Sequence, residues 1–212
     1  MNPTVCEMID RYLSGMQNSL LRPVAVRLSS YGITADALTL AGFLFGVISA
    51  ALIVTGYDRT ALILFFLNRL FDGLDGAVAR LTDPTDRGAF LDIAFDFAIY
   101  AMIPLAFVLA DPTHNALAAS LLLASFMGTS SSFLAFAVIA AKRGATSASF
   151  PQKGIYYLGG LTEGTETIAA FTGMYLWPQH FPAIATIFSA LAVLTTLFRW
   201  SWGWRILSEP KL

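Results

Sequence analysis

Residues 72–80 read DGLDGAVAR and residues 88–96 read GAFLDIAFD, with seven residues between the two segments. Both segments lie in long apolar runs, where an ionised side chain costs several kcal/mol unless it is paired, hydrated or bound. The presence of four carboxylates in these runs therefore indicates a common function. They belong to Asp72, Asp75, Asp92 and Asp96. Helix capping explains a single aspartate and helix packing explains a single glycine, but neither explains the whole set.

Spacing places these carboxylates on two facing helix surfaces. Asp72 and Asp75 are three residues apart and Asp92 and Asp96 are four apart, so each pair shares one helix face. The short connection makes the two helices antiparallel neighbours, on which all four side chains converge. Crowded carboxylates repel one another, and hard divalent cations relieve the repulsion through oxygen ligands. With no His or Cys nearby to suggest zinc, the pattern predicts a Mg²⁺ or Mn²⁺ site.

Small and basic residues surround the aspartates. Gly76, Ala79 and Gly88 leave bare backbone where a ligand can approach closely. Arg80 and Arg87 flank the same space, and arginine suits phosphate oxygens. Metal, small residues and arginine together predict a site for a diphosphate.

The rest of the chain has the composition of a membrane protein. Of its 212 residues, 56% are hydrophobic and 13% are charged, with a mean hydropathy of +0.65. Soluble domains carry about 25% charged residues. The net charge of −1 gives no reason to expect a nucleic-acid partner, and the single Cys6 excludes an internal disulfide.

We expect an all-α integral membrane bundle of six transmembrane helices, because six apolar runs are each long enough to cross a bilayer. The expected spans are residues 34–55, 60–81, 88–109, 115–141, 156–177 and 181–207. Residues 1–33 carry apolar side chains at helical spacing and are expected to form an amphipathic helix in the membrane interface, with a frayed terminus as the alternative. The whole chain, 1–212, is then one domain, with its bundle over 34–207.

Lys and Arg residues predict the orientation of the bundle. With an inside N-terminus, ten of them fall in inside segments, and only Arg59 falls in an outside loop. The positive-inside rule therefore places both termini and the aspartate site on the cytoplasmic side.

At this point the chain resembles the CDP-alcohol phosphotransferase superfamily, whose signature is D-x-x-D-G-x-x-A-R, a spacer, then G-x-x-x-D-x-x-x-D. The resemblance implies that Asp72, Asp75 and Asp92 bind two ions, with Asp96 as the general base and an additional ligand. It also implies nucleotide-binding residues, namely Gly76, Ala79, Arg80, Gly88, Asp36 and Thr39. The chain departs from the family pattern at Ala35, where proline is common, and in its spacer, which usually has eight residues.

The same resemblance implies a reaction. A phosphatidyl group would pass from a CDP-alcohol, above all CDP-diacylglycerol, to a hydroxyl acceptor, with release of CMP. A small bacterial inner-membrane enzyme of phospholipid biosynthesis, working as a homodimer, is the expected protein. The stretch from Asp92 to Phe97 lacks the proline and lysine common in members that use glycerol 3-phosphate, so the sequence names no acceptor.

Other polar residues of the spans are open to two interpretations. Asn68 and Arg69, one turn before Asp72, either support the metal ligands and substrate phosphate, or Arg69 is simply a snorkelling or ion-paired arginine. Glu163 and Glu166 either line an acceptor pocket, touch metal or pair with a buried arginine such as Arg69 or Arg199, or are purely structural.

Lys142 and Arg143 either hold a phosphorylated acceptor or simply follow the positive-inside rule.

Two other classes of protein compete with this interpretation. A membrane prenyltransferase also binds diphosphate through aspartates and Mg²⁺, but such chains are longer and carry two aspartate motifs, whereas only one occurs here. A non-enzymatic metal carrier or membrane scaffold with a degenerate site is the remaining alternative, and metal transport without CDP-lipid dependence would favour it.

Overall fold

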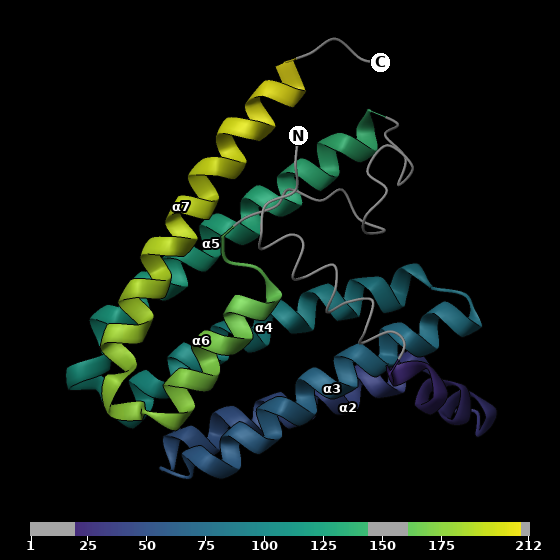
Figure 1. Cartoon of the computed structure of the whole chain (residues 1–212), viewed down its shortest axis with the longest axis horizontal. Helices are drawn as coiled ribbons and strands as arrows, with labels where there is room; N and C mark the ends of the chain where they lie inside the picture. Colours follow the sequence, from purple (N-terminus) through teal and green to yellow (C-terminus); the bar gives the residue numbers. More distant parts are fainter. Residues whose placement is uncertain (1–19, 144–160, 209–212) are drawn as a thin grey trace.

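The computed structural model describes residues 20–143 and 161–208, and every regular element in these ranges is helical (Figure 1). This confirms the expected all-α class. A helix over residues 20–30 comes first. It is followed by α2 (Ala35–Val54), α3 (Asp58–Thr82), α4 (Asp86–Ala110), α5 (Pro112–Lys142), α6 (Gly164–Leu176), the short 3-10 helix η2 (Pro178–His180) and α7 (Phe181–Ser208). Most of the expected interfacial segment, residues 1–19, lies outside the described residues.

Four stretches of the described helices are long and apolar enough to cross a membrane: Ala35–Val54, Asp86–Ala110, Pro112–Lys142 and Pro178–Ser208. The described part of the chain therefore supports a membrane bundle but does not give the six spans expected from sequence. α3 is long enough, at 25 residues, but it carries too many charged residues to count as an apolar span. Its charged residues are Asp58, Arg59, Arg69, Asp72, Asp75 and Arg80. α6 has 13 residues, fewer than the roughly 20 that a span needs.

The helices pack as two groups joined through α4 (Figure 1). α2 packs against α3 and α4, while α5 packs along α7 and also contacts α4. The shorter α6 contacts α3 and α7, so it links the two groups. A core of buried aromatic and aliphatic side chains fills the centre, where Phe65 stacks on Tyr175 and Phe107 stacks on Phe181.

The turn between α3 and α4 sets the two aspartate pairs opposite each other. Asp83 ends α3 with a φ of 69°, a left-handed conformation that Asp tolerates better than most residues. Thr85 then caps α4, because its hydroxyl accepts a hydrogen bond from the Gly88 N–H at 3.0 Å. The seven-residue spacer thus makes a sharp reversal.

Small residues bring α2 close to its neighbours. A Cβ on Gly46 would lie 2.4 Å from Cδ1 of Ile99 on α4, and one on Gly42 would lie 3.1 Å from Cβ of Phe71 on α3. The backbone of α2 can approach both helices only because these positions lack side chains. The approach matters because α2 contributes to the same region as the aspartates.

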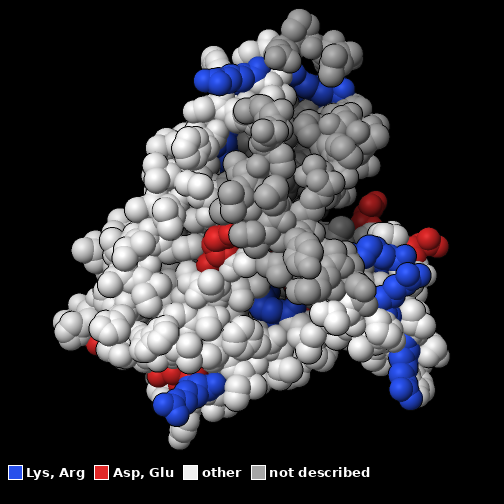
Figure 2. Space-filling model, viewed as in Figure 1, with Lys and Arg blue, Asp and Glu red and all other residues white. Residues whose placement is uncertain are grey.

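Charge is concentrated at the ends of the bundle. Figure 2 shows Lys and Arg mainly at the top, right and lower-left margins of this face, with a few charged side chains near its middle and an otherwise largely uncharged surface. The exposed side chains along the described spans include large apolar ones such as Leu40, Leu44, Leu105, Met127 and Val193. An apolar belt between charged ends is the surface expected of a protein whose solvent is lipid.

Candidate functional site

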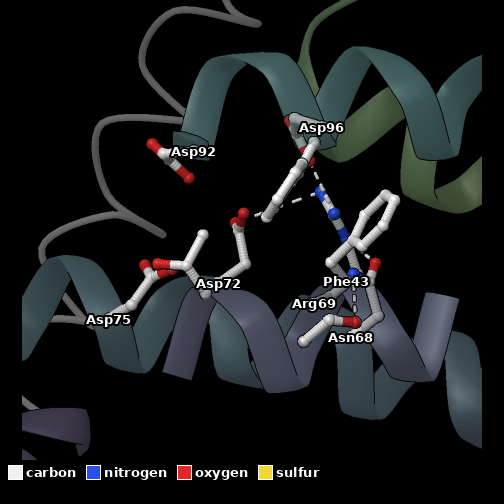
Figure 3. Close-up of a pocket in the computed structure, with 10 residues that line it drawn as sticks. Phe43, Asn68, Arg69, Asp72, Asp75, Asp92 and Asp96 are labelled. Carbon is white, nitrogen blue, oxygen red and sulfur yellow. Dashed lines mark hydrogen bonds and ion pairs between the residues drawn. The ribbon is translucent and has the colours of Figure 1, made fainter. Parts of the chain in front are cut away.

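All four motif aspartates line one cleft between α3 and α4, as Figure 3 shows. Asp72 and Asp75 extend from α3, and Asp92 and Asp96 extend from α4 toward the same space. The convergence predicted from the three- and four-residue spacings is therefore present. Besides the aspartates, the cleft is lined by Thr39, Gly42, Phe43, Asn68, Arg69 and Phe95.

α2 forms one wall of the cleft. The Thr39 hydroxyl donates to the Asp75 carboxylate at 2.5 Å, and both side chains are buried. Further along α2, the Gly42 carbonyl accepts a hydrogen bond from the Asn68 amide at 2.9 Å. These two contacts tie α2 to α3 on either side of Asp72, and they fix the direction of the Asp75 carboxylate.

Arg69 enters the cleft and does not snorkel toward water. Its side chain is only 10% exposed, and its Nη2 lies 2.6 Å from Oδ1 of Asp96. Its Nη1 lies 3.9 Å from Oδ2 of Asp72, so one guanidinium contacts the first and the last aspartates of the motif. Arg69 is therefore an ion-paired arginine inside the bundle, and a role toward metal or substrate phosphate stays a prediction.

A second cluster lies beside the cleft, at the start of α4. Asp36 forms an ion pair with the exposed Arg87. A Cβ on Gly88 would lie 3.1 Å from Oδ1 of Asp36, so the start of α4 lies close to this side chain of α2. A Cβ on Gly76 would lie 3.3 Å from Nη1 of Arg80, which folds back over its own helix. The predicted nucleotide residues Asp36, Gly76, Ala79, Arg80 and Gly88 thus surround the cleft but are not among those that line it.

The candidate acceptor residues lie elsewhere in the bundle and have structural contacts. Glu163 precedes α6, and its backbone N–H donates to the Glu166 side chain at 3.0 Å, which completes a capping box. Arg143 donates to the backbone carbonyls of Ile206 and Leu207 at the end of α7. Lys142 is exposed at the end of α5. None of these four predicted residues lines the aspartate cleft.

The chemistry of the cleft fits hard divalent cations, although its carboxylates stand apart from one another. Among residues 20–143 and 161–208, no three carboxylate, His or Cys side chains are grouped closely enough to hold one ion as they stand. The donor set is nevertheless made of carboxylate oxygens on one cleft. In the described part of the chain, buried Oδ1 of Asp96 has its ion pair with Arg69 but no well-aligned hydrogen bond.

Sequence reasoning missed four residues around the cleft. Gly42 and Phe43 are three and four residues after Thr39, so helical periodicity from Thr39 was a usable signal for both. Phe95 stacks on Phe43 with ring centroids 4.2 Å apart, and both rings line the cleft. Tyr100 follows Asp96 by four residues on the same face of α4, and its hydroxyl accepts from Nη1 of Arg69 at 3.2 Å.

Comparison with known proteins identifies the family. The CDP-alcohol phosphatidyltransferase family model matches residues 32–200. The inner membrane protein YnjF of Escherichia coli (strain K12) is 49% identical over 195 residues, which cover 92% of this chain and 95% of that protein. The match favours an enzyme over a metal carrier or scaffold, and it rules out a membrane prenyltransferase.

Solved structures share the fold. Phosphatidylinositol phosphate synthase of Mycobacterium tuberculosis with CDP-DAG bound superposes with a TM-score of 0.65 and 24% identity, covering 88% of this chain and 94% of that one. The same protein in complex with manganese and citrate gives a TM-score of 0.64 and 24% identity, covering 87% and 88%. At 24% identity, the similarity to these structures shows the fold alone. The chemistry is indicated by the family match and by the complete aspartate motif. The chain belongs to the CDP-alcohol phosphatidyltransferase family and is an enzyme of that class.

Proposed function

We propose that the protein transfers a phosphatidyl group from CDP-diacylglycerol to a hydroxyl acceptor and releases CMP, as a step of phospholipid biosynthesis. The observation that carries this proposal is the convergence of Asp72, Asp75, Asp92 and Asp96 on one cleft. The related fold of the Mycobacterium tuberculosis synthase, solved with CDP-DAG bound, supports the choice of donor.

The lining of the cleft suits the polar part of such a donor. The cleft is partly open to solvent and is lined by all four motif aspartates together with Arg69 and Asn68. The diphosphate would lie at the aspartates, and the acyl chains would lie along the apolar outer surface of the bundle. Gly76, Ala79 and Gly88 would border the cytidine nucleotide, with Arg80, Asp36 and Thr39 beside it.

Asp72, Asp75 and Asp92 would hold two Mg²⁺ or Mn²⁺ ions, with Asp96 as a further ligand. When bound, these ions neutralise the charge of the diphosphate and of the departing CMP phosphate. Thr39 keeps the Asp75 carboxylate aimed into the cleft. The two aspartate pairs, facing each other from neighbouring helices, would position the donor. Positioning and charge neutralisation supply most of the catalysis in phosphoryl transfer.

Asp96 takes the proton of the acceptor hydroxyl as the general base. The acceptor oxygen then bonds to the lipid-side phosphorus, and the bond from that phosphorus to the oxygen of the CMP phosphate breaks. The products are a phosphodiester lipid and CMP, with the proton on Asp96. The stacked rings of Phe43 and Phe95 line the cleft, where they would limit the entry of water that competes with the acceptor.

The placement in the membrane is also part of the proposal. The protein would lie in a bacterial inner membrane with both termini and the cleft on the cytoplasmic side, as the Lys and Arg distribution and the name of the Escherichia coli relative support. α3 and the segment containing α6 would complete six spans. α3 can cross despite its charges because Asn68, Arg69 and Asp75 are turned into the protein. We further propose a homodimer, as is common in this family.

CMP release by the purified protein in lipid–detergent micelles tests the proposal. CDP-diacylglycerol is supplied with Mg²⁺ or Mn²⁺, and glycerol 3-phosphate, inositol phosphate, inositol, serine and phosphatidylglycerol are compared as acceptors with plain buffer. Metal-dependent CMP release with one acceptor is expected, and it would also identify that acceptor. Failure to bind CDP-diacylglycerol in the presence of metal would contradict the proposed donor. Binding without turnover would leave the donor standing and point to a different acceptor.

A further inference from the structure

Arg69 is a buried cation inside the aspartate cleft, and the proposed reaction does not use it. Its side chain is 10% exposed, while the partners Asp96 and Asp72 are 29% and 38% exposed. The guanidinium is therefore more buried than the carboxylates it contacts. Figure 3 shows it beside Asp96, on the side of the cleft away from Asp75 and Asp92. A surface ion pair would contribute little, but a pair formed at this depth is weakly screened by water.

The guanidinium is held in place by groups that are not metal ligands. Nε donates to Oδ1 of Asn68 at 2.8 Å, and Asn68 is in turn bound to the Gly42 carbonyl. Nη1 donates to the Tyr100 hydroxyl at 3.2 Å, and the Tyr100 ring lies 5.3 Å from Cζ of Arg69, within the range of a cation–π contact. Groups from α2, α3 and α4 thus tether Arg69 at a fixed position beside Asp96.

A fixed positive charge at this position has a consequence for cation binding. Asp96 and Asp72 come from different helices, and Arg69 contacts both, so it already neutralises part of the charge that a divalent ion would neutralise. A metal ion that uses Asp96 must share that carboxylate with the guanidinium and must also bear its repulsion.

We propose that Arg69 is an internal counter-cation of the aspartate site: it stabilises the metal-free protein by pairing with Asp96 and Asp72, and it competes with divalent cations for these carboxylates. The inference rests on the proposed function in one respect, namely that these aspartates bind the metal. Its consequence is an enzyme that folds without metal and binds metal weakly until the diphosphate of the donor adds negative charge to the cleft.

Mn²⁺ binding by the full chain in nanodiscs, without donor or acceptor, tests this role. Arg69→Gln removes the charge and keeps a polar side chain, Arg69→Lys keeps the charge, and Arg59→Gln removes the same charge from the exposed start of α3. We expect Arg69→Gln to bind Mn²⁺ at least about tenfold more tightly than the wild type. Arg69→Lys should fall between the two, and Arg59→Gln should match the wild type.

Thermal unfolding supplies the second measurement. We expect Arg69→Gln to have a lower Tm than the wild type without metal, and to regain most of the difference in saturating Mn²⁺, because the ions replace the missing charge. A residue that only packs helices together would lower Tm equally with and without Mn²⁺. Unchanged or weaker Mn²⁺ binding by Arg69→Gln, or a Tm loss that Mn²⁺ does not reduce, overturns the proposal.

A second variant covers the case in which Arg69→Gln cannot be purified even with Mn²⁺. Tyr100→Phe removes one tether of the guanidinium and leaves the charge, so it should bind Mn²⁺ a few-fold more tightly; unchanged binding overturns the proposal. The failure of the proposed function looks different. If the wild type binds no Mn²⁺ at any concentration, both the metal site and the counter-cation role of Arg69 are wrong. If the wild type binds Mn²⁺ and the Arg69 substitutions leave its affinity unchanged, only the counter-cation role is wrong.

Discussion

The hydroxyl of Thr39 lies 2.5 Å from the carboxylate of Asp75 and donates a hydrogen bond to it, so a residue of α2 orients a predicted metal ligand of α3. Groups that orient a metal ligand typically contribute 10- to 100-fold to metal affinity. Thr39→Val keeps the shape of the side chain and removes the donor. We expect it to weaken Mn²⁺ binding by about that factor, measured by calorimetry, while Thr39→Ser retains the affinity. Equal affinity in the valine and serine variants would contradict an orienting role.

The general base can be separated from the metal ligands by substitution. Asp96→Asn keeps the size of the side chain but cannot accept the acceptor's proton. We expect CMP release to fall by about 10²- to 10⁴-fold, while Mn²⁺-dependent binding of CDP-diacylglycerol persists. Asp92→Asn is the matched comparison on the same face of α4, and it should lose both turnover and metal-dependent binding. Wild-type turnover in Asp96→Asn would remove the base assignment.

Removal of metal should abolish activity reversibly. The cleft offers carboxylate oxygens, which are ligands for Mg²⁺ and Mn²⁺. We expect EDTA to stop CMP release and either ion to restore it after the chelator is removed by dialysis. The extent of recovery measures how far the metal-free protein keeps its fold. CMP release that persists in EDTA would show that the aspartates act without metal.

Spacing alone predicted the centre of the site. Pairs of aspartates three and four residues apart each share one helix face, and a short turn makes the two helices neighbours, so the pairs can converge; the cleft contains all four. Arg69 could not be placed in this way, because an arginine within a span is equally compatible with snorkelling to water and with pairing inside the bundle. Asn68 and Tyr100 bind the Arg69 side chain inside the bundle, and Tyr100 lies 31 positions from Arg69 in the sequence.

The roles of residues singled out only by their charge were the hardest to predict from the sequence. Glu163 and Glu166 left an acceptor pocket, a metal contact, pairing with a buried arginine and a structural role open. They form a capping box at the start of α6, and the charge of Glu163 also interacts with that of Arg199. Arg143 suggested a phosphate site, but it binds carbonyls at the end of α7. Backbone groups thus contact all three side chains, and a side-chain pattern does not reveal such contacts.

Gly46 should be essential for the packing of α2 against α4. A Cβ at this position would lie 2.4 Å from Cδ1 of the buried Ile99. We therefore expect Gly46→Ala to destabilise the protein by about 1–3 kcal/mol, seen as a lower Tm in detergent, and Ile99→Val to recover part of the loss. Gly173→Ala is the control, because its Cβ would meet Ile184 at an ordinary 3.5 Å. An equal Tm for both alanine variants would contradict the close approach.

Tyr175 stabilises the bundle without taking part in the chemistry. The Ser49 hydroxyl donates its one proton to the Ala61 carbonyl at 2.7 Å, so the Tyr175 hydroxyl, also 2.7 Å from Ser49, must be the donor to it. Tyr175→Phe should cost about 1 kcal/mol. Ser49→Ala should cost more, because it leaves two buried groups without a partner, and the double variant should cost less than the sum. Ser49 lies about 15 Å along α2 from Thr39, so CMP release per folded protein should not change; a loss of turnover at unchanged Tm would instead place Tyr175 in the catalytic machinery.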